Sequence, residues 1–210
     1  SYFDKDGFPL SRNPNELIII SKHLILCGET IKDAQKYAPE FLDNIIEKNL
    51  HCINFIKTPE NKIPLFNGAT EGDLNQFEKY ILENKKKEKE KKEIIGGIYS
   101  AKFKSQALFV DVGQPPSKNF SSNYQSGPMS FEYFLDGIKI ITNCGYGRNI
   151  SPKAELISKF TASQSTLTIN DTSVTKFERN KLLNKVFGNS INSTFKTSNF
   201  NSKNDKSLIG

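Results

Sequence analysis

Apolar positions recur at helical spacing in the first part of the chain. A first helix is predicted from Asn13, a candidate N-cap before Pro14, to Gly28. A second is predicted for residues 39–56, and a third begins near residue 73 and continues into a lysine-rich stretch. The first part of the chain is therefore expected to be helical throughout.

After a pair of glycines, the apolar residues alternate with polar ones. Strands are predicted at residues 98–104, 107–112, 129–135, 138–142 and 166–170. The dipeptide Asp136-Gly137 lies between the third and fourth of these and favours a two-residue β-hairpin. Helices followed by strands predict segregated layers, hence an α+β chain with an antiparallel sheet and no parallel βαβ units.

The composition changes most sharply where the helical pattern gives way to strands, so a domain boundary is expected there. The predicted parts are a helical domain at 1–84, a lysine-rich linker at 85–95, a strand-rich domain at 96–188 and a polar tail at 189–210. The tail is either disordered or a truncated strand region.

The formal net charge of the 210 residues is +6, which favours an acidic partner such as nucleic acid, anionic lipid or acidic polysaccharide. Six lysines and two glutamates in residues 85–92 supply much of this excess, and such a run is typical of a solvated helix end or linker. Aromatic residues are not interleaved with basic ones as in an RNA-binding sheet. No apolar run is long enough to span a membrane. We therefore predict no nucleic-acid partner and no membrane span.

Familiar catalytic motifs are absent from the sequence, including the P-loop, GxGxxG, HExxH and GxSxG patterns. Three cysteines without a CxxC pair and only two histidines indicate neither a disulfide framework nor a histidine-based metal site. What remains is a set of polar segments at strand ends, at residues 111–116, 123–132, 141–145 and 161–167. Each of them, taken alone, is typical of ordinary loops.

Taken in order, short segments of the chain resemble the heparinase II/III family of polysaccharide lyases, in its alphaproteobacterial branch. The matching segments are Ser11-Arg12-Asn13-Pro14, Leu65-Phe66-Asn67-Gly68, Asp111, Ser130-Phe131-Glu132, Asn143-Cys144-Gly145 and Ser165-Thr166-Leu167. They keep their order and spacing from about Asp6 to Phe177. The resemblance implies a partial chain that holds the C-terminal helices of an α/α toroid followed by an incomplete antiparallel β-sandwich.

The resemblance also implies a chemistry. Lyases of this family cleave acidic, uronate-containing polysaccharides by β-elimination, which needs a base, an acid and a group that neutralises the uronate carboxylate. By position, a catalytic histidine of the family falls on Asn123, whose amide has no useful pKa, and Tyr124 and Tyr146 are the remaining candidate acids or bases. The candidate substrate-binding residues are Arg12, Asn13 and Arg148.

Many members of the family hold a structural zinc, and the resemblance places its ligands at Gln125, Asn143 and Gln164. All three are neutral amides, whereas zinc favours anionic or imidazole ligands. We therefore predict no metal and no other cofactor. Instead, the three amides are expected to hydrogen-bond one another across the same gap.

Three functions stay open from the sequence. The first is a carbon–oxygen lyase acting on an acidic polysaccharide, the second is a non-catalytic relative that binds a glycan or cell-envelope polymer, and the third is a structural protein of the cell envelope. An open cleft lined by Asn123, Tyr146 and Arg148 would favour the first two. The family implies the periplasm or cell envelope, with the cytoplasm, the oligomeric state and the particular glycan left open.

Overall fold

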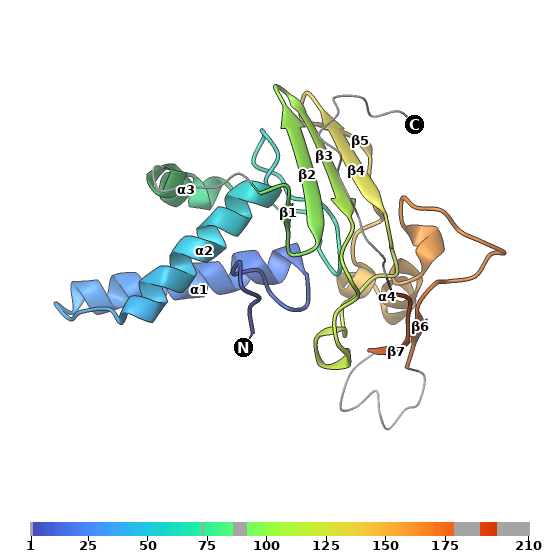
Figure 1. Ribbon diagram of the computed structural model, residues 1–210, viewed down its shortest axis with the longest axis horizontal. Helices are drawn as coiled ribbons and strands as arrows, with labels where there is room; N and C mark the ends of the chain where they lie inside the picture. The colour runs from blue at the N-terminus through green and yellow to red at the C-terminus, as the bar shows by residue number, and fades with distance from the viewer. Residues whose placement is uncertain (1, 73, 86–91, 179–189, 197–210) are drawn as a thin grey trace.

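A computed structural model describes residues 2–72, 74–85, 92–178 and 190–196. The helices are α1 (Pro14–Asp33), α2 (Glu40–Ile56), α3 (Glu78–Lys85) and α4 (Pro152–Ser158). The strands are β1 (Ile94–Ile95), β2 (Ile98–Phe103), β3 (Gln106–Asp111), β4 (Phe131–Leu135), β5 (Ile138–Ile141), β6 (Lys176–Phe177) and β7 (Ile191–Ser193). Helices α1 to α3 extend from one side of a central sheet, and α4, β6 and β7 gather near its other side (Figure 1).

The sheet has five strands in the order β1-β2-β3-β4-β5, and each neighbouring pair is antiparallel. The predicted α+β class with an antiparallel sheet is confirmed. The hairpin prediction is also confirmed, because Leu135 pairs with Ile138 and both turn residues, Asp136 and Gly137, have positive φ angles of 49° and 79°. Strands β6 and β7 form a separate two-stranded sheet.

One face of the sheet packs on the helices and forms the main core. Phe109 and Phe134 on this face are fully buried, and they join Leu17 of α1 and Ile53 of α2 in one apolar cluster. The opposite face carries exposed apolar side chains, such as Phe103, which is 66% exposed. This alternation is the pattern of a sheet that is buried on one side. Within the described residues, no helix is long and apolar enough to cross a membrane.

The helix bounds agree with the prediction for α2 but not for α1, which continues five residues beyond Gly28 to Asp33. A β-carbon on Gly28 would lie 3.4 Å from Cδ1 of Ile46, so this glycine lies where α1 and α2 approach each other. It is a packing position, not a helix end. The third helix is preceded by a 3₁₀ turn at Asn75–Phe77, and residue 73 lies outside the described range.

The strand predicted at residues 166–170 is wrong, because only a single bridge between Ile169 and Thr172 forms there. Ile169 is 64% exposed, and no strand in the described part of the chain pairs with this segment. Helix α4 was not predicted, although Ser151 caps it and proline occupies its first position. Outside the described range lie residues 86–91 of the predicted linker, 179–188 of the predicted strand-rich domain, and 189 and 197–210 of the predicted tail. The domain boundaries stay a prediction.

Candidate functional site

Three predicted site residues from distant segments meet at one place, which we call the amide–tyrosine site: Asn13, Asn123 and Tyr146. Asn13 caps α1, Asn123 lies between β3 and β4, and Tyr146 follows β5. The Tyr146 hydroxyl lies 3.3 Å from Asn123 Oδ1. Asn13 and Asn123 meet over Gly68, where a β-carbon would lie 2.8 Å from Asn13 Nδ2 and 2.7 Å from Asn123 Cβ.

The Gly68 backbone makes this meeting possible. Its φ of +97° is one that other residues rarely adopt, and no β-carbon fits between the two asparagines. Its N–H also donates to Gln125 Oε1 at 2.9 Å, which ties the loop to a second set of amides. Gly68 belongs to a segment that carried the family resemblance, but the sequence alone assigned it no role in a site.

Asn13 and Asn123 keep amide N–H groups that no other described residue accepts. Asn13 Oδ1 accepts from the Asn15 backbone N–H at 2.8 Å as the helix cap, which leaves Nδ2 next to Gly68. Asn13 is only 2% exposed, whereas Asn123 is half-buried. Asn13 Nδ2 is not one of the fully buried atoms that lack a partner, so it stays open to solvent, and a ligand oxygen would fit there.

The Tyr146 hydroxyl donates to Glu155 Oε1 of α4 at 2.6 Å. Tyr146 is 8% exposed, and burial, together with the Glu155 carboxylate, raises its pKa above the ordinary value. Glu155 is a site residue that the sequence analysis missed. Recognition of the Ser151-Pro152 helix start would have placed it on a helix, but only the fold brings it to Tyr146.

Two cationic side chains lie close to Tyr146 and Glu155. Arg148 is exposed and makes no hydrogen bond or ion pair within the described ranges. Lys159 is fully buried, and burial lowers its pKa to about 8, with Arg148 acting in the same direction and Glu155 opposing it. Its Nζ donates to the carbonyl oxygen of Ser122, the residue before Asn123. Lys159 therefore stabilises the segment before Asn123 from the protein interior, while the Arg148 side chain is exposed to solvent.

Tyr124, a predicted catalytic residue, lies in the interior. It is 1% exposed and packs in a cluster with Phe177 and Ile191. Burial raises the pKa of its hydroxyl, which has no hydrogen-bond partner among the described residues. A polymeric substrate cannot reach this hydroxyl in the described structure, so we correct the prediction and regard Tyr124 as a core residue.

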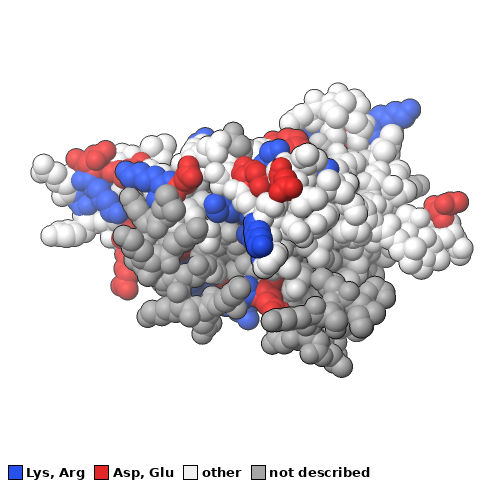
Figure 2. Space-filling view, turned by 90° about the horizontal axis from the view of Figure 1, so that it is seen from above, with Lys and Arg blue, Asp and Glu red and all other residues white. Residues whose placement is uncertain are grey.

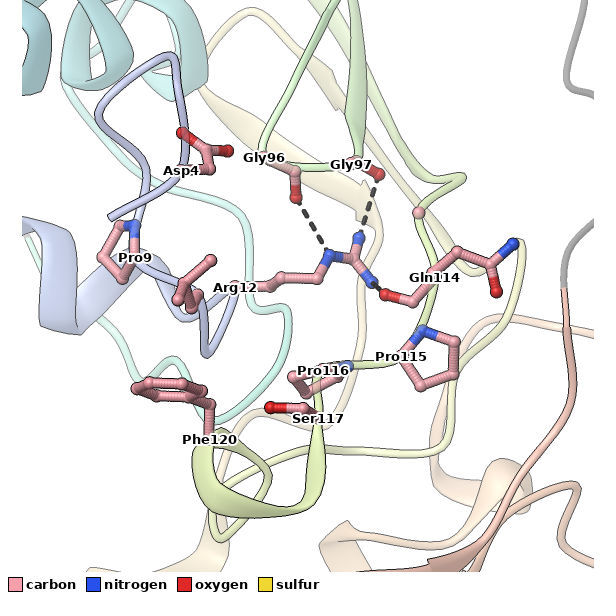
Figure 3. A pocket seen from close by; sticks show the side chains of 12 residues that line it. Asp4, Pro9, Arg12, Gly96, Gly97, Gln114, Pro115, Pro116, Ser117 and Phe120 are labelled. Carbon is pink, nitrogen blue, oxygen red and sulfur yellow. Dashed lines mark hydrogen bonds between the residues drawn. The ribbon is translucent and has the colours of Figure 1, made fainter. Parts of the chain in front are cut away.

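Arg12, a predicted substrate-binding residue, binds backbone groups of the protein itself (Figure 3). Its guanidinium donates to the carbonyl oxygens of Gly96 at 2.9 Å, Gly97 at 2.9 Å and Gln114 at 3.1 Å, and it forms a buried ion pair with Asp111. Asn67 Nδ2 also reaches Asp111, at 3.4 Å. Arg12 therefore joins the start of α1 to the sheet, and this correction removes it from the candidate substrate-binding set.

Two cavities lie outside the amide–tyrosine site. One of about 350 Å³ adjoins Arg12, Pro116 and Phe120 (Figure 3). The other, of about 1070 Å³, lies between α4 and strands β6 and β7. Neither is lined by Asn123, Tyr146 or Arg148, so neither is the cleft expected at those residues.

Two of the three amides at the expected zinc positions come together around one carbonyl. Gln125 Nε2 and Gln164 Nε2 each donate to the Ser158 carbonyl oxygen at 2.8 Å, and both lie within 4 Å of Cys144 Sγ. Asn143 instead accepts from the Ser165 backbone N–H at 2.9 Å, and its Nδ2 has no described partner. The expected hydrogen bonds between amides do not form, because the three amide side chains bind backbone groups instead.

These residues do not fit a zinc ion. Gln125 Oε1 accepts from Gly68 and its Nε2 donates to backbone carbonyls, so its oxygen is already engaged. The described residues contain no cluster of three histidine, cysteine, aspartate or glutamate side chains suited to a metal.

Glu132 of β4 is a further buried carboxylate that the sequence analysis did not single out. It is 0% exposed, and it accepts from the Thr142 hydroxyl at 2.7 Å and from the backbone N–H groups of Asn143 at 2.8 Å and Leu65 at 3.0 Å. Burial raises its pKa, and these hydrogen bonds act in the opposite direction. Glu132 thus connects β4 to the segments that contain Leu65 and Asn143.

Surface charge adds no second site on the face that Figure 2 shows. Among the described residues in this view, lysine and arginine side chains lie next to aspartate and glutamate side chains and do not form one continuous basic patch. The net charge of +6 therefore does not by itself mark a binding surface on that face.

Comparison with known protein families assigns the chain to one of them. The family model "Heparinase II/III-like, C-terminal" matches residues 96–209, more than half of the sequence, so the chain belongs to the heparinase II/III-like family. A search of curated proteins found no match. The family is one of polysaccharide lyases, as the ordered segments of the sequence indicate.

Solved structures with the same fold are lyases. A heparinase III with methylated lysines is 14% identical, with a TM-score of 0.67 over 82% of this chain and 31% of that one. The heparan sulfate lyase HepC from Pedobacter heparinus is 16% identical, with a TM-score of 0.65 over 85% of this chain and 33% of that one. The chain therefore spans about a third of their length and holds toroid helices followed by the beginning of a β-sandwich.

Proposed function

We propose that this chain is part of a polysaccharide lyase that cleaves acidic, uronate-containing glycans by β-elimination. The observation that carries the proposal is the meeting of Asn13 and Asn123 over Gly68, with the Tyr146 hydroxyl 3.3 Å from Asn123 Oδ1. Two amides with N–H donors left over and an exposed arginine lie beside a tyrosine hydroxyl. Membership of a lyase family supports the same conclusion.

Each residue has a proposed part in the reaction. The amide N–H groups of Asn13 and Asn123, together with Arg148, bind the uronate carboxylate and stabilise the negative charge that develops on it. Tyr146 donates a proton to the leaving glycosidic oxygen. Asn123 has no acid–base function, so another group of the full-length protein supplies the base in this proposal.

The test is an ultraviolet assay of the full-length protein against a panel of uronate polysaccharides, because β-elimination creates a conjugated, absorbing product. Tyr146→Phe is expected to lower activity at least about 100-fold. Tyr133→Phe is the matched control, since that hydroxyl donates to Gln106 on the sheet. A flat trace from folded wild-type protein across the panel would contradict lyase activity.

A second candidate is a non-catalytic relative that binds an acidic glycan. It is favoured by the amides Asn123 and Gln125, which stand where the family resemblance places histidines. Glycan binding without an ultraviolet signal, lost on Arg148→Ala, would support this candidate. For the compartment we propose the periplasm or cell envelope, which fractionation of the native cells would test.

A further inference from the structure

The Tyr146 hydroxyl has one proton and two neighbouring acceptors. Glu155 Oε1 lies at 2.6 Å and Asn123 Oδ1 at 3.3 Å. A short hydrogen bond to a carboxylate is charge-assisted and stronger than a long one to an amide. The proton of Tyr146 is therefore held by Glu155, and the bond to Asn123 is secondary.

The charges around Tyr146 decide which form of the phenol is stable. Glu155 approaches from α4, Arg148 from the 3₁₀ segment Gly147–Asn149, and Lys159 from the end of α4. A phenolate at Tyr146 would lose hydration and would face the Glu155 carboxylate at hydrogen-bond distance. Arg148 favours the phenolate, but it is exposed to solvent, which screens its charge.

We propose that Glu155 is a positioning residue that keeps Tyr146 a proton donor, so that Tyr146 protonates the leaving oxygen and does not act as the base. This inference rests on the proposed lyase function. A base removes the proton from the ring carbon next to the carboxylate, and the electron pair of that C–H bond forms the new carbon–carbon double bond. As the bond from the neighbouring ring carbon to the glycosidic oxygen breaks, its electron pair goes to the oxygen. The Tyr146 O–H bond breaks, a new O–H bond forms on the leaving sugar, and water returns a proton to the phenolate.

The alternative assignment, Tyr146 as the base, needs a phenolate before the reaction starts. The carboxylate at 2.6 Å opposes that ionisation, and a residue selected as a base would not be expected beside it. The negative charge of Glu155 therefore favours Tyr146 as the acid over Tyr146 as the base. The protein must supply the base from another group.

The first test measures the ionisation of Tyr146 and needs no catalysis. Tyrosinate absorbance is followed against pH in the full-length protein, and Tyr146→Phe identifies the Tyr146 signal by difference. Glu155→Gln is expected to lower the Tyr146 pKa towards the ordinary tyrosine value of about 10, whereas Glu155→Asp keeps the carboxylate and the raised pKa. An unchanged Tyr146 titration in Glu155→Gln would overturn the proposal.

The second test is the pH dependence of lyase activity. Glu155→Gln is expected to lose activity at a lower alkaline pH than the wild type, because its donor deprotonates sooner. Activity that instead rises at alkaline pH in this variant would make Tyr146 the base and refute the proposal. Glu71→Gln, an exposed carboxylate paired with Lys139, is the control. Inactive wild-type protein with the expected titration shift would contradict only the lyase function.

Discussion

Asn123 and Gln125 are two residues apart in the chain, both stand at positions where the family resemblance of the sequence implies histidines, and they have opposite surroundings. Gln125 is 2% exposed, and both its oxygen and its nitrogen bind backbone groups. Asn123 is half-buried and keeps an amide N–H without a described partner. An amide whose hydrogen bonds are complete contributes to stability, whereas one with donors left over is available to a ligand.

The two predicted arginines show the same difference. Arg12 has four protein acceptors, including Asp111, whereas Arg148 has none in the described part of the chain. Both fit the chemistry of carboxylate binding equally well in sequence. Their partners in the fold, and not the residue type, separate a structural arginine from a candidate binding one.

The largest expected effect tests this difference between the arginines. Arg12→Ala leaves the Asp111 carboxylate buried without its charged partner and is expected to lower the free energy of unfolding by about 3–5 kcal/mol. Arg148→Ala is expected to stay within about 0.5 kcal/mol of the wild type. Urea denaturation of both variants gives the measurement, and equal losses would contradict the comparison.

Gly68 connects the amide–tyrosine site to Gln125, so its replacement should disturb both regions. Gly68→Ala places a β-carbon 2.7 Å from Asn123 Cβ at a φ of +97°, and a loss of about 2 kcal/mol is expected. Gly72→Ala is the matched control, because nothing lies within 4 Å of its β-carbon. Thermal unfolding compares the two, and similar melting temperatures would show that the contact over Gly68 is dispensable.

Glu132 is predicted to make stability depend on pH. Because burial raises its pKa in the folded state, its contribution is fully present below the unfolded pKa and is lost as pH rises through the folded value. Relative to Glu132→Gln, the wild type should lose up to about 1.4 kcal/mol per pH unit in that interval. Urea denaturation of both proteins across acidic to neutral pH provides the measurement, and parallel curves would refute the prediction.

Arg148 should affect ligand binding without affecting stability. Arg148→Ala is expected to weaken binding of a uronate oligosaccharide about fivefold, since an exposed charge pair is a modest contribution. Lys153→Ala, an exposed cation in the first turn of α4, serves as the control. Calorimetric titration of both variants would decide the matter, and equal affinities would remove Arg148 from the site.

The smallest expected effect concerns zinc. A chelator should leave the melting temperature unchanged, because Gln125 and Gln164 already bind the Ser158 carbonyl. The combined variant Gln125→His, Asn143→Asp and Gln164→His supplies ligands that zinc favours and is expected to gain zinc affinity. Elemental analysis of both proteins tests this, and stoichiometric zinc in the wild type would contradict it.

Local rules account for the parts of the fold that were predicted correctly. The bounds of α2 follow from helical spacing of apolar residues between Pro39 and Pro59, and the hairpin follows from Asp136-Gly137. Both depend on residues close together in the chain. The order of helices before strands was enough to predict the α+β class.

Predictions failed where distant residues decide the outcome. Gly28 has the residue type of a helix end but is a contact with Ile46. Residues 166–170 have the alternation of a strand, but no described strand pairs with them. Tyr124 has the chemistry of a catalytic acid, yet packing buries it beside Phe177. In each case the local pattern was compatible with two environments.

By itself, the sequence of this protein determined its periodic elements, its family and which side chains carry suitable chemistry. Only the tertiary structure decided that Arg12 is saturated by Asp111 and that Glu155 meets Tyr146. The physical reason is that the hydrogen bonding and ionisation of a side chain depend on the dielectric and charge around it. Contacts between residues far apart in the chain create that environment.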